Sequence, residues 1–169
     1  QKIVALGYKM LNMINLSLDM YKMEQGVYQF NPVPVDIVRV IADILQENRN
    51  FVLSKKLTTE IVLNDHPVAD DEKFTIPGEK LLFYSLLSNL IKNAFEASPR
   101  KEKITISLYD ASGYTVGIHN SGVVPEDIRD TFFEKYSTSG KSKGTGLGTY
   151  SAKMITETQG GQISLDTSE

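Results

Sequence analysis

The sequence contains no cysteine, no long apolar run and no strong excess of either charge. The absence of cysteine excludes disulfide bonds and thiolate chemistry, and it is typical of proteins in a reducing compartment. A membrane-spanning helix needs about 18 consecutive apolar residues, and no such run is present. The formal net charge of −3 predicts no general surface for nucleic acid. The length of 169 residues and the ordinary apolar content predict one globular domain, with an additional helix attached.

The first 25 residues have the pattern of a long helix that ends at Gly26. A heptad-like stripe runs along it, with successive spacings of 3, 4, 3, 4 and 3: Ile3, Leu6, Met10, Met13, Ser17 and Met20. This stripe favours a coiled coil or helix bundle, and an amphipathic helix docked on its own domain is the alternative. The helical pattern is already present at Gln1, so we expect the chain to be a piece of a longer protein.

Residues 26–169 mix helices and strands without regular βαβ alternation. Helices are expected at 36–45, 79–97, 126–132 and 148–158, and strands at 27–30, 58–63, 74–76, 103–109, 114–119 and 162–165. Residues 31–34 are expected to form an extended connector, and residues 64–72 a polar loop. The pattern indicates an α+β fold: a two-layer sandwich with a mixed β-sheet and helices on one face, preceded by a long helix.

A glycine-rich segment precedes the last predicted helix and reads Gly144-Thr145-Gly146-Leu147-Gly148. Glycines let the backbone approach an anion closely, and the unpaired amides of a helix N-terminus attract phosphate. The segment fits neither the P-loop pattern nor the dinucleotide fingerprint. A phosphate site of another kind is therefore predicted, with a plain tight turn as the alternative. The loop just before this segment contains Lys135, Lys141 and Lys143. We expect this loop to fold over a polyphosphate, and a solvated charged loop is the alternative.

Asn89, Asn93 and Glu96 form a polar stripe on the otherwise apolar helix 79–97. Asparagine is a poor helix former, and its amide oxygen is a good ligand for Mg²⁺. The pair therefore indicates a cation site, with a solvated helix face as the alternative. Asn120 follows the strand 114–119 and precedes Gly122, where an amide can recognise the edge of a base.

Taken together, these residues resemble the sensor histidine kinases. Asn89-Leu90-Ile91-Lys92-Asn93-Ala94 resembles their N box, Phe132-Phe133-Glu134-Lys135-Tyr136 their F box, and Gly144-Thr145-Gly146-Leu147-Gly148 their G2 box. These kinases share a superfamily with Hsp90, DNA gyrase and the MutL proteins. The order and spacing match over roughly residues 36–165. Residues 1–25 resemble the end of the second helix of the dimerisation and phosphoacceptor domain.

The resemblance implies a Bergerat-type ATP-binding fold over residues 26–169, with an ATP lid at about 125–148. It implies ATP and Mg²⁺ as cofactors, and Asn89, Asn93 and Lys141 as catalytic residues. Asn93 would coordinate Mg²⁺, Asn120 would accept from the adenine amino group, and Lys141 would reach the phosphates. The nucleotide-binding set that it implies is Asn89, Asn93, Asn120, Gly122, Tyr136, Lys141, Gly144, Thr145, Gly146, Leu147 and Gly148.

The chain departs from the family where the G1 box usually reads Asp-x-Gly-x-Gly, because here Asn120 is neutral and Val124 replaces the second glycine. An asparagine oxygen still accepts from adenine, without charge-assisted strengthening. Members of the wider superfamily that hydrolyse ATP usually have Glu at the position of Asn89, so the resemblance favours phosphotransfer to histidine over hydrolysis. Neither His66 nor His119 lies in the first helix, so the acceptor histidine is expected outside this chain.

The expected function is transfer of the ATP γ-phosphoryl group to that histidine and then to an aspartate of a response regulator. The expected partners are a receiver domain and a second copy bound through the N-terminal helix, with no nucleic acid and no membrane contact. The expected location is the cytoplasm, whether or not the full-length protein is membrane-anchored. The alternatives are a degenerate docking module without catalysis and an ATP-hydrolysing domain of the Hsp90, gyrase and MutL kind.

Overall fold

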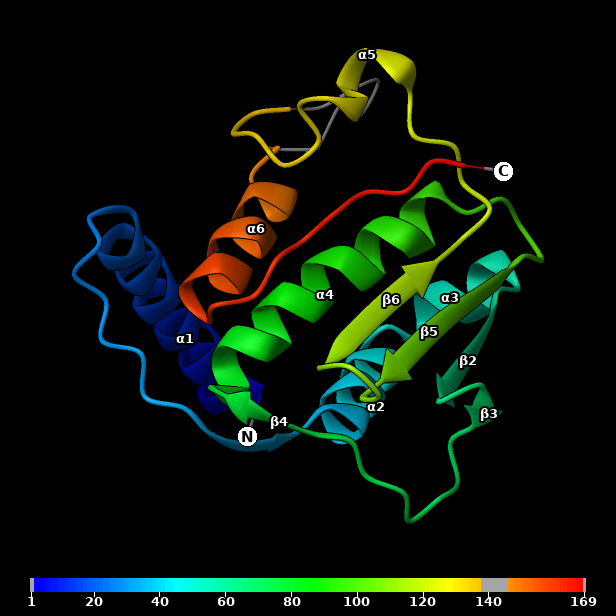
Figure 1. Ribbon diagram of the computed structural model, residues 1–169, viewed down its shortest axis with the longest axis horizontal. Helices are drawn as coiled ribbons and strands as arrows, with labels where there is room; N and C mark the ends of the chain where they lie inside the picture. The colour runs from blue at the N-terminus through cyan, green and yellow to red at the C-terminus, as the bar shows by residue number, and fades with distance from the viewer. Residues whose placement is uncertain (1, 138–145, 169) are drawn as a thin grey trace.

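A four-stranded mixed sheet forms the centre of the computed structural model, which describes residues 2–137 and 146–168 (Figure 1). Its strand order is β3-β2-β5-β6, from β2 (Thr58–Leu63), β3 (His66–Pro67), β5 (Lys103–Tyr109) and β6 (Thr115–His119). β2 and β5 are parallel, with Ile61 opposite Ile106, and β6 returns antiparallel to β5. Isoleucine and leucine side chains alternate with polar ones along β5, so one face of the sheet is buried.

Helices cover that buried face. α2 (Ile37–Glu47) and α4 (Lys80–Ala97) contribute to one continuous core with β2 and β5. α2 begins where predicted, because the Asp36 carboxylate accepts from the amide of Arg39 at 3.4 Å. α6 (Gly148–Thr158) packs along α4, and the short α5 (Glu126–Arg129) lies in the segment that connects β6 to α6. The predicted α+β sandwich with helices on one face is confirmed.

Four local predictions were wrong. Residues 33–36 form strand β1 (Val33–Asp36), which pairs with β4 (Thr75–Gly78) and is more than a connector. The polar loop 64–72 contains β3. In addition, residues 49–55, for which no element was predicted, form α3 (Arg49–Lys55), a helix with no fully buried residue. Residues 27–30 and 162–165 are extended without strand pairing. Tyr28 instead donates a side-chain hydrogen bond to Glu79 at 2.7 Å, which explains its partial burial.

The C-terminal half of α1 (Lys2–Glu24) docks on α6, and the two helices lie side by side in Figure 1. Met23 is buried with Leu82 and Ile155, and Leu16 and Met20 pack against them. On the same helix, several large apolar side chains stay exposed: Met10, Leu11, Ile14, Leu18 and Tyr21. Of the predicted heptad stripe, Met20 therefore belongs to the docked face, whereas Met10 points to solvent. None of the helices in the described ranges combines the length and hydropathy needed to span a bilayer.

Candidate nucleotide-binding site

One face of α4 connects the motifs that the sequence separates. Asn89, Asn93 and Ala97 follow one another at intervals of four residues, so they lie about 6 Å apart along one side of the helix. The opposite side buries Leu87, Ile91 and Phe95 in the core, which fixes the rotation of the helix. Asn89 and Asn93 are half-buried at the boundary of this packed face. This side of α4, from Asn89 to Ala97, is called the α4 floor below. It contacts a different part of the chain at each of its two ends.

At the first end, α6 begins directly beside Asn89. A Cβ on Gly148 would lie 3.7 Å from the amide oxygen of Asn89. Leu147, at the N-cap position of α6, supplies no side-chain cap, and the first turn has no acidic residue. A helix N-terminus carries partial positive charge. This end therefore combines an attractive environment for an anion with an amide oxygen that could bind a cation.

Tyr136 and Gly146, both within the predicted lid at about 125–148, contact each other through their backbones. The Tyr136 amide donates to the Gly146 carbonyl at 3.0 Å. Both residues have left-handed backbones, with φ near 65°. A Cβ on Gly146 would lie only 2.5 Å from the Tyr136 carbonyl carbon, so no other residue fits this position without movement. Lys141, Gly144 and Thr145 lie outside the described residues.

At the second end, the turn after β6 rests on the last turn of α4. A Cβ on Gly122 would lie 2.6 Å from the carbonyl oxygen of Ala97, so the glycine is required for this close approach. Half-buried Asn120 stands between β6 and Gly122, and its Nδ2 would lie 2.7 Å from the same Cβ position. The Asn120 amide therefore lies directly beside Gly122, where the turn contacts the end of α4.

Lys135 joins the base of the lid to α1. Its ammonium contacts Glu24 at 2.6 Å and lies 4.9 Å from the ring centre of Tyr150, whose hydroxyl donates to Glu24 at 3.1 Å. The hydrogen bond from Lys135 lowers the pKa of Glu24, and the reciprocal bond raises the pKa of Lys135. This lysine therefore has a carboxylate partner, and a contact with polyphosphate stays a prediction.

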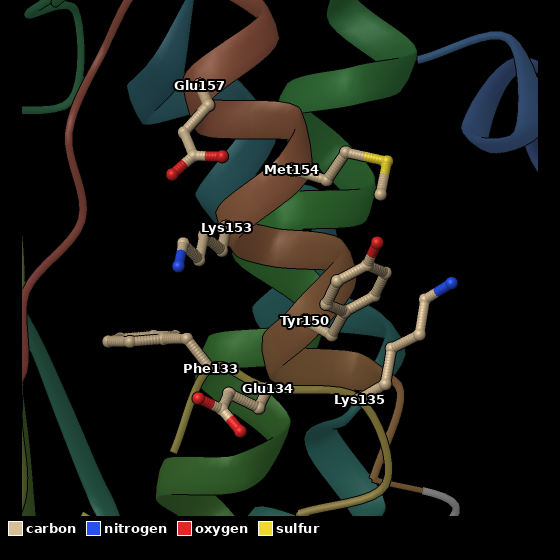
Figure 2. A pocket seen from close by; sticks show the side chains of 7 residues that line it. All are labelled: Phe133, Glu134, Lys135, Tyr150, Lys153, Met154 and Glu157. Carbon is tan, nitrogen blue, oxygen red and sulfur yellow. The ribbon is translucent and has the colours of Figure 1, made fainter. Parts of the chain in front are cut away.

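An open groove of about 250 Å³ lies beside Lys135 and Tyr150, between residues 133–135 and α6 (Figure 2). It is lined by Phe133, Glu134, Lys135, Tyr150, Lys153, Met154 and Glu157. Phe132 and Phe133 pack edge to face at 5.1 Å, which stabilises the turn that carries Lys135. In Figure 2 the lining side chains lie on both sides of the exposed face of α6, and α4 lies behind this helix.

The donor chemistry suits Mg²⁺ held mainly by phosphates and water. No group of three or more His, Asp or Glu side chains within residues 2–137 and 146–168 could form a metal site on its own. Neutral amide oxygens on α4 would leave the positive charge of the ion available to phosphates. The histidines do not add to the site, since His66 binds Glu72 at the β3 edge and His119 is exposed. The role of the Ala97 carbonyl was missed, because a backbone atom leaves no signal in a sequence.

Comparison with known proteins agrees with this arrangement. Residues 78–169 match the family described as histidine kinase-, DNA gyrase B- and HSP90-like ATPase. The chain is 25% identical over 170 residues to the sensor histidine kinase WalK of Bacillus subtilis strain 168, an alignment that includes 95% of the chain and 27% of WalK. The chain therefore spans about a quarter of that relative's length.

Two solved structures support the fold. The histidine kinase AdeS of Acinetobacter baumannii aligns with a TM-score of 0.65 at 18% identity, over 92% of this chain and 71% of AdeS. Full-length ShkA, whose crystal structure was solved in complex with AMPPNP, aligns with a TM-score of 0.68 at 18% identity, over 92% of this chain and 32% of ShkA. The resemblance to sensor histidine kinases is confirmed. The chain belongs to the family of histidine kinase-, DNA gyrase B- and HSP90-like ATPases.

Proposed function

We propose that this chain is the ATP-binding catalytic part of a two-component sensor histidine kinase. The observation that carries the proposal is the shared floor of α4. Asn89 lies beside the N-terminus of α6 at one end, and Ala97 supports Gly122 and Asn120 at the other. A single bound ATP would thus meet its phosphate and base contacts along one helix. The AMPPNP complex of ShkA supports nucleotide binding by a relative of the same fold.

The phosphate end would be formed by the glycine-rich segment, with Gly144, Gly146 and Gly148 against the phosphates. Thr145, Leu147 and Tyr136 would complete it, and Lys141 would reach the phosphates from the lid. Asn93 would hold Mg²⁺ through its amide oxygen, with Asn89 beside it. When bound, Mg²⁺ would neutralise charge on the phosphates as the γ-phosphoryl group leaves ADP. The rest of this chain's contribution is positioning.

The base end would be formed by Asn120 and Gly122. The Asn120 amide oxygen would accept a hydrogen bond from the adenine amino group. Because an amide is neutral, this bond would be weaker than the charge-assisted bond that an aspartate makes. We therefore expect the phosphate end to supply most of the affinity.

The phosphoryl group would pass to a histidine outside this chain and then to an aspartate of a response-regulator receiver. Residues 1–25 would belong to the dimerisation and phosphoacceptor helix, with the exposed apolar side chains of α1 facing a second copy. The chain would act in the cytoplasm.

Calorimetric titration with ATP tests the Mg²⁺ assignment. In the presence of Mg²⁺ we expect Asn93→Ala to lose detectable ATP binding while its circular dichroism stays unchanged. Asn50→Ala is the matched control, because Asn50 is an exposed asparagine on α3. In EDTA the two variants and the parent chain should bind equally weakly.

Unchanged affinity in Asn93→Ala would contradict the metal role of Asn93. Failure of the parent chain to bind ATP at all would contradict the proposed function, and it would favour a degenerate docking module. Release of inorganic phosphate at a substantial rate would instead favour a hydrolase.

A further inference from the structure

Lys55, the last residue of α3, binds the end of α4. Its ammonium donates to three backbone carbonyls: Phe95 at 3.0 Å, Glu96 at 2.8 Å and Ser98 at 2.9 Å. The Phe51 ring centre lies 5.5 Å from the same ammonium. A cation at a helix C-terminus satisfies carbonyls that have no partner within the helix and complements the helix dipole. Lys55 therefore caps α4 from another element.

The capped helix end is also the support of the turn after β6. The Ala94 carbonyl is occupied by the amide and hydroxyl of buried Ser98, at 3.0 and 2.7 Å. Lys55 binds the carbonyls on either side of Ala97. The Ala97 carbonyl itself faces Gly122, and its oxygen would lie 2.6 Å from a Cβ on that glycine. A displacement of this last turn would move Gly122, and Asn120 precedes Gly122 by two residues.

We propose that Lys55 is a positioning residue for the base-binding end of the site. By fixing the last turn of α4, it holds the Ala97 carbonyl as the support of Gly122 and so sets the place of the Asn120 amide. The inference rests on the proposed function for its effect on nucleotide, but the displacement of Gly122 does not depend on ATP binding. The phosphate end, two helical turns away at Asn89, should be unaffected.

The test compares Lys55→Met with Lys56→Met, which removes the same charge from the neighbouring exposed lysine. Calorimetry with Mg²⁺ would measure the affinity for ATP and for inorganic tripolyphosphate, which has no base. We expect Lys55→Met to weaken ATP binding about tenfold, which corresponds to about 1.4 kcal/mol, and to leave tripolyphosphate binding unchanged. Lys56→Met should change neither. An equal loss for both ligands would overturn the inference.

A second arm uses the chain without ligand. In ¹H–¹⁵N NMR spectra, Lys55→Met should shift the Gly122 amide and the Asn120 side-chain amide and leave the Gly148 amide in place. If the parent chain failed to bind ATP, this arm would still decide the inference. Unmoved Gly122 and Asn120 signals would overturn it.

Lys55→Gln covers the case in which Lys55→Met does not fold, because its amide retains two donors for the same carbonyls. We expect smaller shifts at Gly122 in this variant, in the same direction. Unfolding of both variants would overturn a positioning role, since Lys55 would then be required for the fold itself.

Discussion

Single residues in the site differ in how strictly glycine is required. Gly122 and Gly146 lie so close to backbone atoms that a Cβ would fall within 2.6 Å of them. Gly148 leaves ordinary van der Waals space beside Asn89, at 3.7 Å. The sequence shows all of these glycines as one kind of signal, because it carries no information on what faces them. Only the packing separates the glycines that the fold needs from one that leaves room for a ligand.

Gly122→Ala should destabilise the chain by about 1–3 kcal/mol, the usual cost of forcing an extra methyl group into a packed site. It should also weaken ATP binding, because the turn that carries Asn120 must move. Urea denaturation measures the first effect and calorimetry the second. Gly117→Ala is the control, because its Cβ would meet the Ser107 side chain at 3.7 Å, an ordinary contact. Equal stability of the two variants would show that the turn does not rest on Ala97.

His66 provides a prediction on pH. The hydrogen bond with Glu72, at 3.1 Å, raises the pKa of His66 above its ordinary 6.5 and lowers that of Glu72. The stability that His66 contributes is complete below about pH 6.5 and is lost as the pH rises through the raised folded-state pKa. An NMR titration should therefore place the His66 midpoint above 6.5, and Glu72→Gln should return it toward that value. An unchanged midpoint in Glu72→Gln would exclude the pair in solution.

At the scale of helices and strands, periodicity decided which predictions succeeded. α2, α4, β2 and β5 were located closely because each buries one regular face against the core. α3 buries no residue, so its sequence shows no apolar stripe. Apolar and polar residues alternate over 27–30 as they would in a strand. Here the alternation reflects the packing of Tyr28 and its hydrogen bond to Glu79, and these residues pair with no strand. Side-chain patterns report burial, and burial does not require regular structure.

The docking of α1 can be tested with two methionines of the same helix. Met23 is buried against Leu82 and Ile155, whereas Met10 is 64% exposed. Met23→Ala should lower the free energy that holds α1 on α6 by about 2–5 kcal/mol, which is enough to release the end of α1. Hydrogen exchange of the amides at 16–24 should then accelerate, with little change in β5. Met10→Ala should leave the exchange unaltered, and acceleration in both variants would contradict docking through Met23.

At the scale of the whole molecule, the sequence predicted the family and the fold class but not how the parts meet. The motifs were sufficient to predict the family and the fold class, because their order and spacing along the chain are typical of the family. The contact of Glu24 with Lys135 joins residues that are far apart in the sequence, and neither residue lies in a pattern that indicates the other. The contact of Gly122 with Ala97 was likewise not predictable from the sequence, since it involves a backbone carbonyl.

The chain alone should not phosphorylate itself. Its two histidines lie at the β3 edge and at the end of β6, and neither belongs to α1. Incubation with γ-labelled ATP and Mg²⁺ should give no acid-labile, base-stable label on this chain. A longer chain that includes a preceding histidine-bearing helix should acquire such label and lose it to a receiver domain. Label on His66 or His119 would refute the placement of the acceptor outside this chain.

The hydrogen bond between Tyr136 and Gly146 has a consequence for how this protein can change. The bond holds together two backbone groups that lie ten positions apart in the chain. Closing a longer flexible loop costs only about 0.6 kcal/mol for each doubling of its length. A change in the number of residues between these two positions would therefore cost little folding free energy, provided that the phosphate-binding residues proposed above are kept. Relatives could then differ in length between these two positions while α4 and α6 stay the same.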